Sequence, residues 1–149
     1  MTSPILLAFS SAKCPGKSSK IGQGKAGMTK LFFDTYAFAE IIFGNPAYQQ
    51  FANDTEILTT QLNLMELYYS LRFSHDKQSA IKLLSDYEEL AIPFSTETII
   101  EAMEFRKANK DKKLSYADSL GYTLAKKHGA AFLTGDKEFK DMPNVLFVK

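Results

Sequence analysis

Four acidic residues stand at positions where an α/β chain could bring them together. Each lies just after a short apolar run or near the start of a helical pattern: Asp34, Glu66, Asp118 and Asp136. Carboxylate oxygens without Cys or His partners select hard ions, so Mg²⁺ or Mn²⁺ is expected here and Zn²⁺ is not. Such an ion binds phosphate oxygens and activates water. The residue types therefore point to phosphodiester hydrolysis.

Each acid taken alone also has a purely structural explanation. Asn63 precedes Glu66 by three residues and Ser115 precedes Asp118 by three, which is the spacing of a helix N-cap followed by an acid. Asp34 and Asp136 would cap the elements that follow them. Taken together, however, four neighbouring carboxylates would raise one another's pKa values and repel. A bound cation would relieve that conflict, so both explanations stay open.

The elements that must position these acids alternate along the chain. Short β-like runs separated by helical patterns are typical of parallel β-α-β units, so we predict an α/β fold with a central parallel sheet of about five strands flanked by helices. Because ligands bind at the carboxyl ends of such strands, the acids should meet at one sheet edge. The predicted strands cover residues 31–33, 56–60, 91–94, 130–134 and 145–148. The predicted helical segments cover residues 35–43, 47–52, 62–73, 75–89, 96–109, 116–127 and 137–142.

Length and composition indicate one domain with a short extension. The 149 residues are 45% hydrophobic, enough for a single core. Residues 1–27 are rich in Ser, Lys and Gly without periodicity, whereas the sequence becomes regular from Met28. We interpret 1–27 as a flexible extension that need not belong to the native chain, and 28–149 as the folded domain. A single Cys14 and the lack of an apolar run of about 18 residues favour a cytoplasmic protein without a membrane span.

Charge is distributed unevenly between these two parts. The extension contains four lysines and no acid, whereas residues 28–149 carry 14 basic and 17 acidic side chains, a net charge of about −3. An acidic body does not bind nucleic acid by bulk electrostatics, so a nucleic-acid function needs a local source of positive charge. A divalent ion at the four acids would supply it. The basic run from Arg106 to Lys113 is interpreted first as a solvated face, and alternatively as a guide for an RNA backbone.

Four segments in this order resemble the motifs of PIN domains, and the likeness is greatest to VapC-like toxins of type II toxin-antitoxin pairs. These segments are Leu31-Phe32-Phe33-Asp34-Thr35, Asn63-Leu64-Met65-Glu66-Leu67-Tyr68-Tyr69, Leu114-Ser115-Tyr116-Ala117-Asp118 and Phe132-Leu133-Thr134-Gly135-Asp136-Lys137-Glu138-Phe139. The resemblance spans roughly residues 29 to 149.

The resemblance implies a PIN-like fold and an endoribonuclease that hydrolyses single-stranded RNA with Mg²⁺ or Mn²⁺. It implies that Asp34 and Asp118 are the most direct metal ligands, that Glu66 and Asp136 complete the acidic pocket and orient water, and that the Thr134 hydroxyl supports them. It also implies a cognate antitoxin and a homodimer. Two alternatives remain open: a catalytically idle PIN scaffold that serves as a binding module, and an RNA-processing nuclease that is not a toxin.

Overall fold

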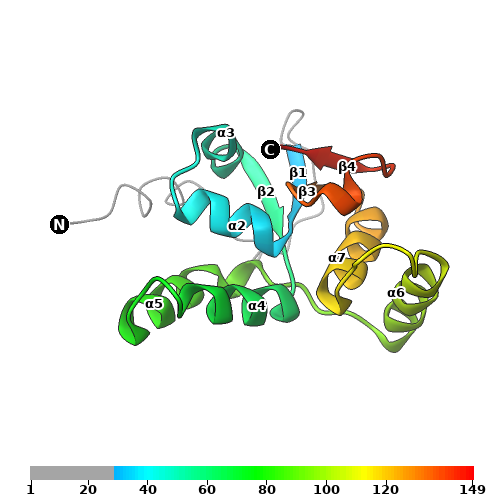
Figure 1. The fold of residues 1–149 in the computed structure, drawn as a ribbon, viewed down its shortest axis with the longest axis horizontal. Helices are drawn as coiled ribbons and strands as arrows, with labels where there is room; N and C mark the ends of the chain where they lie inside the picture. Colours follow the sequence, from blue (N-terminus) through cyan, green and yellow to red (C-terminus); the bar gives the residue numbers. More distant parts are fainter. Residues whose placement is uncertain (1–28) are drawn as a thin grey trace, which may run out of the picture.

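A parallel four-stranded sheet forms the centre of the molecule (Figure 1). The computed structural model describes residues 29–149, so the extension expected over 1–27 lies outside the described residues. The strands follow the order β2-β1-β3-β4, and every pairing is parallel. The α/β class predicted from the sequence is confirmed. The strands are β1 (Thr29–Phe33), β2 (Thr55–Leu58), β3 (Ala131–Thr134) and β4 (Val145–Phe147).

The prediction of a further strand over residues 91–94 is wrong. Thr59 donates its N–H to Leu90 O at 3.0 Å and accepts from the N–H of Ile92 at 2.9 Å, which makes a single parallel bridge between Thr59 and Ala91. The next residue is Pro93, which has no N–H to extend the ladder. The described sheet therefore has four strands where about five were expected.

The helices lie close to their predicted positions. The expected helix over residues 75–89 begins two residues later, because the Asp76 side chain caps it by accepting from the N–H groups of Gln78 and Ser79. None of the helices in residues 29–149 has the length and apolar character needed to cross a bilayer. The helices are α2 (Thr35–Ile42), α3 (Pro46–Gln49), α4 (Gln61–Leu71), α5 (Lys77–Tyr87), α6 (Thr96–Ala108) and α7 (Tyr116–Lys127), with the 3-10 turns η1 (Gln50–Ala52), η2 (Glu88–Leu90) and η3 (Lys137–Phe139).

Each face of the sheet has its own hydrophobic core. Leu31 and Phe33 of β1 pack with residues of α2 to α5, whereas Phe32 between them packs with α6, α7 and η3 on the other face. All three side chains are buried, as expected for a parallel sheet covered on both sides. Figure 1 shows the two helical layers, with α4 and α5 side by side and α7 next to the sheet.

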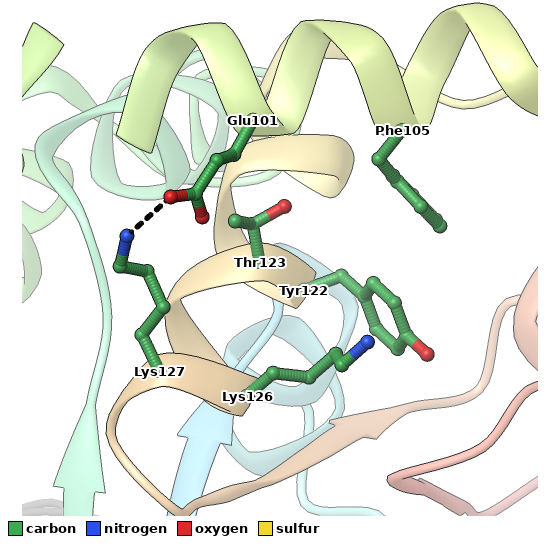
Figure 2. A pocket seen from close by; sticks show the side chains of 6 residues that line it. All are labelled: Glu101, Phe105, Tyr122, Thr123, Lys126 and Lys127. Atoms are coloured by element: carbon green, nitrogen blue, oxygen red, sulfur yellow. Dashed lines mark hydrogen bonds and ion pairs between the residues drawn. The ribbon is translucent and has the colours of Figure 1, made fainter. Parts of the chain in front are cut away.

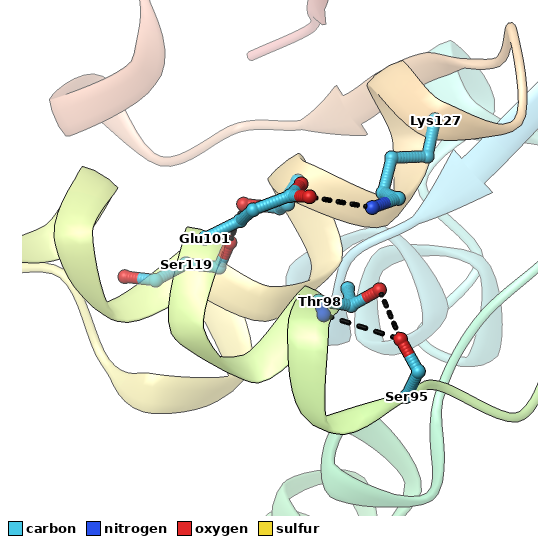
Figure 3. A network of polar contacts seen from close by, with 6 residues as sticks. Ser95, Thr98, Glu101, Ser119 and Lys127 are labelled. Atoms are coloured by element: carbon cyan, nitrogen blue, oxygen red, sulfur yellow. Dashed lines mark hydrogen bonds and ion pairs between the residues drawn. The ribbon is translucent and has the colours of Figure 1, made fainter.

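Helices α6 and α7 are joined by aromatic and polar contacts. Phe105 of α6 stacks on Tyr122 of α7 with ring centroids 4.9 Å apart (Figure 2). Lys127 Nζ lies 2.8 Å from Glu101 Oε1, which forms an ion pair across the two helices (Figure 3). These contacts hold α6 against α7.

Gly121 on α7 allows this helix to approach the sheet closely. A Cβ at this position would lie 2.6 Å from Cε1 of Phe32 and 3.2 Å from Cε2 of Phe132, both buried in the core. We therefore expect Gly121→Ala to lower the free energy of unfolding by roughly 1 to 3 kcal/mol through overpacking. Chemical denaturation would measure it. A change below about 0.5 kcal/mol would show that the two rings move aside easily.

Candidate metal centre

The predicted site lies at the carboxyl ends of β1 and β3. From there the chain continues to β2 on one side of this pair and to β4 on the other. Asp34 follows β1 and Asp136 follows β3, and these strands are adjacent. In open α/β sheets such a topological switch point, at the carboxyl ends of the strands, is where ligands bind. A pocket of about 490 Å³, here called the acidic pocket, opens there. Its lining residues are Asp34, Thr35, Tyr36, Ala39, Ser70, Asp118, Gly135, Asp136, Lys137 and Lys149.

Asp34 is the most deeply buried of the four acids, with 3% of its surface exposed. Its side chain caps α2 by accepting from the N–H of Thr35 at 2.8 Å. Its own N–H donates to Leu133 O at 3.2 Å, which fastens the end of β1 to β3. The capping explanation is correct for this residue, and the same carboxylate also lines the pocket.

The Thr134 hydroxyl connects two of the acids. It donates to Asp34 Oδ2 at 2.8 Å and accepts from the N–H of Asp136 at 3.1 Å. The Asp136 carboxylate in turn accepts from the N–H of Glu138 and caps η3. Thr134 is fully buried, so this arrangement fixes the ends of β1 and β3 relative to each other.

Asp118 reaches the pocket from the first turn of α7. It forms the predicted capping box: the Ser115 N–H donates to Asp118 Oδ2 at 2.6 Å, and the Asp118 N–H donates to Ser115 Oγ at 3.0 Å. The half-buried carboxylate is thereby held at the helix N-terminus, where the helix dipole favours negative charge.

Glu66 lies beside the other acids but is not among the residues that line the pocket. Its Oε2 accepts at 2.9 Å from the hydroxyl of Thr35, the residue next to Asp34. The pattern Asn63-x-x-Glu66 predicted Asn63 as the N-cap of this helix, and that prediction is wrong. Thr60 is the N-cap and accepts from the Asn63 N–H at 3.3 Å.

Asn63 is a residue of the site that the sequence did not reveal. It is fully buried and accepts from the Thr60 hydroxyl at 2.6 Å. Its amide donates to Thr35 Oγ1 at 3.3 Å and, at 3.5 Å, to Asp34 Oδ1. Asn63 thus positions both Asp34 and the hydroxyl that holds Glu66. The only signal for this role is its place one helical turn before Glu66, which equally fits a cap.

Gly135, between Thr134 and Asp136, lets the backbone pack closely against Tyr36 and Val148. A Cβ there would overlap the Tyr36 ring and lie 2.7 Å from the carbonyl oxygen of Val148. Because Val148 O is a backbone atom, the neighbour cannot move away alone. A side chain at position 135 would therefore displace Asp136, Tyr36 or the C-terminal segment.

The electrostatics of the site disfavour a full set of carboxylate charges. Burial, followed by the charge of Asp118, raises the pKa of Asp34 to about 7, although hydrogen bonds from Thr134 and Thr35 act in the opposite direction. Burial also raises the pKa of Asp118, with smaller contributions from Glu66 and Asp136. The four acids therefore lie close enough to influence one another, as the sequence predicted.

The residues fit a hard divalent ion by their chemistry. The donors are all oxygens, and the charges that act most strongly on buried Asp34 are negative, so a cation would stabilise its ionised form. In residues 29–149, however, no three His, Cys, Asp or Glu side chains are gathered closely enough to hold a metal. Protein hydrogen bonds hold Asp34, Asp118 and Glu66 instead. Binding an ion would thus require side-chain movements within the pocket.

Sequence comparison identifies the family. Residues 31–145 match the family described as PIN domain, which is most of the chain. The chain belongs to the PIN-domain family. The four acids fall within the matched part of this PIN domain. None of the curated proteins compared with the chain matches it in sequence.

Solved structures share the fold of this PIN domain. A chain of a toxin-antitoxin complex from Klebsiella pneumoniae aligns with a TM-score of 0.61 at 21% identity, over 78% of this chain and 95% of that one. A chain of VapBC2 from Rickettsia felis, crystallised with a DNA fragment from the VapBC2 promoter, aligns with a TM-score of 0.61 at 22% identity, over 80% and 98%. At these identities the likeness establishes the common fold.

Proposed function

We propose that this PIN domain is a metal-dependent endoribonuclease that hydrolyses phosphodiester bonds of single-stranded RNA. The observation that carries the proposal is that Asp34, Asp118 and Asp136 line one pocket at the carboxyl ends of the strands. Membership of the PIN-domain family supports it. The oxygen donors favour Mg²⁺ or Mn²⁺ as the ion.

Each acid has a distinct place in the proposed mechanism. Asp34 and Asp118 are the most direct ligands, because both line the pocket and both have raised pKa values that a cation would lower. Asp136 in the pocket and Glu66 beside it complete the set of acids and orient the attacking water. Thr134 holds Asp34 through its hydroxyl. When bound, the ion polarises the scissile phosphate and neutralises the charge that develops on it.

Two lysines at the pocket provide complementary charge. Lys137 and Lys149 line it beside the three aspartates, and both are exposed. Ammonium groups at this place can contact the phosphates that flank the scissile bond, which positions the strand without reading its sequence. The pocket thus combines acids for the ion with cations for the substrate.

The proposal includes a toxin role, with a cognate antitoxin and a homodimer as partners. The two similar structures come from a toxin-antitoxin complex and from VapBC2. An exposed apolar stripe along α4 and the turn after it also supports a protein partner: Met65, Tyr69 and Phe73, spaced four residues apart, are 62, 70 and 77% exposed. Growth arrest on expression, relieved by the product of a neighbouring gene, would separate a toxin from a housekeeping nuclease.

A second candidate is a PIN scaffold that binds a partner without catalysis. The observation in its favour is that the acids in residues 29–149 are not gathered closely enough to hold an ion. Calorimetric titration with Mn²⁺ would distinguish the two candidates. Binding that is lost in Asp118→Asn supports the nuclease, whereas no binding supports the scaffold.

Incubation of the full chain with a mixed pool of single-stranded RNA, in Mn²⁺, in Mg²⁺ and in chelator, tests the nuclease directly. We expect cleavage with either ion and none in chelator. Asp118→Asn should lower the rate by about 100-fold or more, because it removes charge where the ion binds. Asp86→Asn, an exposed position on α5, serves as the matched control and should cleave normally. Equal cleavage by the two variants would contradict the assigned site.

A further inference from the structure

A second pocket, here called the basic pocket, lies where the end of α6 meets the start of α7. Its volume is about 420 Å³. Four of its six lining residues are cationic and one is aromatic. The lining residues are Met103, Arg106, Lys107, Lys110, Lys112 and Tyr116. This composition contrasts with the net negative charge of residues 28–149.

Arg106 and Tyr116 form a cation–π pair in the basic pocket. The guanidinium carbon of Arg106 lies 4.6 Å from the centroid of the Tyr116 ring. Arg106 Nε also donates to Leu114 O at 3.1 Å, which holds the guanidinium in place. Tyr116 is 63% exposed although it is a large aromatic residue. Aromatic rings and guanidinium planes of this kind stack against unpaired bases.

The lysines of the basic pocket carry charge that the protein does not neutralise. The ion pairs formed within residues 29–149 use Lys30, Lys82 and Lys127 instead. Lys107 and Lys110 are exposed. The acids nearest in sequence, Glu104 and Asp111, are exposed and do not line the pocket. The pocket is therefore suited to a polyanion.

The basic pocket and the acidic pocket lie on opposite sides of the first turn of α7. Tyr116 and Asp118 both lie in the first turn of α7 and, being two residues apart, point about 200° from each other around the helix. Lys112 Nζ donates to Glu138 O at 2.7 Å, and the N–H of Glu138 donates to Asp136. The two pockets thus flank the same helical turn, and the hydrogen bond from Lys112 connects the basic pocket to the segment that carries Asp136.

We propose that the basic pocket is a binding subsite for single-stranded RNA, in which Lys107 and Lys110 contact backbone phosphates and the Arg106–Tyr116 pair stacks on an unpaired base. This inference rests on the proposed nuclease function, because a strand held here would extend around α7 to the acidic pocket. Unpaired bases distinguish single strands from duplex RNA, whose bases are stacked inside the helix. The subsite would therefore select single-stranded substrates.

A different pocket, between α6 and the far end of α7, provides a matched control. Lys126 and Lys127 line it together with Glu101 and Tyr122 (Figure 2). There Lys127 pairs with Glu101, and Lys126 lies over the Tyr122 ring at 5.6 Å. Lys126 is ten residues from Tyr116, which is about 15 Å along the helix. Lys126→Gln thus removes one charge from the same helix outside the proposed subsite.

Fluorescence anisotropy with a labelled single-stranded oligoribonucleotide, recorded in chelator with the full chain, tests the subsite without cleavage. We expect the Lys107→Gln/Lys110→Gln double variant to bind about 10-fold more weakly, and its slope of log affinity against log salt to decrease by about 1.4. Tyr116→Leu should bind about 10-fold more weakly with an unchanged slope, and Tyr116→Phe should bind like wild type. Lys126→Gln should stay within about twofold. The lysine variants alter exposed side chains, so circular dichroism should show an unchanged fold.

The outcomes separate this inference from the nuclease proposal. Binding that depends on the basic pocket, without metal-dependent cleavage, would support the subsite and overturn the nuclease. Metal-dependent cleavage with variants that bind like wild type would support the nuclease and overturn the subsite. If polyglutamate competes as well as unlabelled RNA of equal charge and Tyr116→Leu has no effect, the pocket binds acidic chains in general, which also overturns the subsite for RNA.

Discussion

Asp34→Asn is expected to abolish metal-dependent RNA cleavage while making the metal-free protein more stable. The loss of activity should be about 1000-fold or more, because the substitution removes a buried negative charge from the proposed ion site. The gain in stability follows from the pKa of Asp34, which is about 7 in the folded chain against an ordinary value of 3.8. Ionising this group in the folded protein therefore costs up to about 4 kcal/mol at alkaline pH.

The pH dependence of this effect has a definite sign. Because the folded state holds the Asp34 proton more tightly than the unfolded state, metal-free wild type should lose stability as the pH rises from about 4 to about 7. Asp34→Asn should flatten that part of the curve, and Mg²⁺ should restore stability to wild type alone. Denaturation at several pH values, with Asp86→Asn as control, would measure this. A less stable Asp34→Asn variant at pH 8 would contradict the assignment.

Thr134→Val should lower the cleavage rate by about 10- to 100-fold, the usual effect of losing a partner that orients a metal ligand. Valine has nearly the same shape as threonine, but it cannot donate to Asp34 or accept from the N–H of Asp136. In wild type the hydrogen bond from Thr134 lowers the pKa of Asp34. Its loss should raise that pKa, so the acidic limb of the pH–rate profile should move to higher pH. Measuring the rate from about pH 5 to 9 would show this shift.

Two further variants make the Thr134 prediction specific. Thr134→Ser keeps the hydroxyl and should retain most of the activity with a nearly unchanged pH profile. Thr123→Val removes a buried hydroxyl from α7 that donates to Ser119 O, away from the acidic pocket, and should cleave like wild type. A Thr134→Val profile that overlays that of wild type would show that the hydroxyl has no part in tuning Asp34.

The sequence predicted that the acids lie near one another, because their closeness depends on the topology of the sheet. Once strands at 31–33 and 130–134 are adjacent and parallel, Asp34 and Asp136 must follow the same sheet edge. The role of Asn63 could not be predicted in this way. Whether Asn63 or Thr60 caps α4 depends on where the helix begins, and a shift of three residues separates a capping residue from a buried one.

The features that the sequence missed depend on contacts between distant segments. The strand expected over 91–94 does not form because Thr59, the residue after β2, makes a single bridge with Ala91 before Pro93 interrupts the ladder. The Arg106–Tyr116 pair depends on the path of the loop between α6 and α7, which no periodicity describes. The run from Arg106 to Lys113 identified the charge of the basic pocket, but the ring that completes it belongs to another motif.

The central position of β3 also determines when the proposed metal site can form during synthesis. The hydroxyl of Thr134 that holds Asp34 is made 100 residues after it, and β3 must pair with β1 before the still later β4 can pair with β3. The chain must therefore have left the ribosome at least through Asp136 before the acidic pocket exists. A growing or prematurely terminated chain that ends before β3 carries Asp34 without the Thr134 hydroxyl and without Asp136, so the proposed site cannot assemble in it.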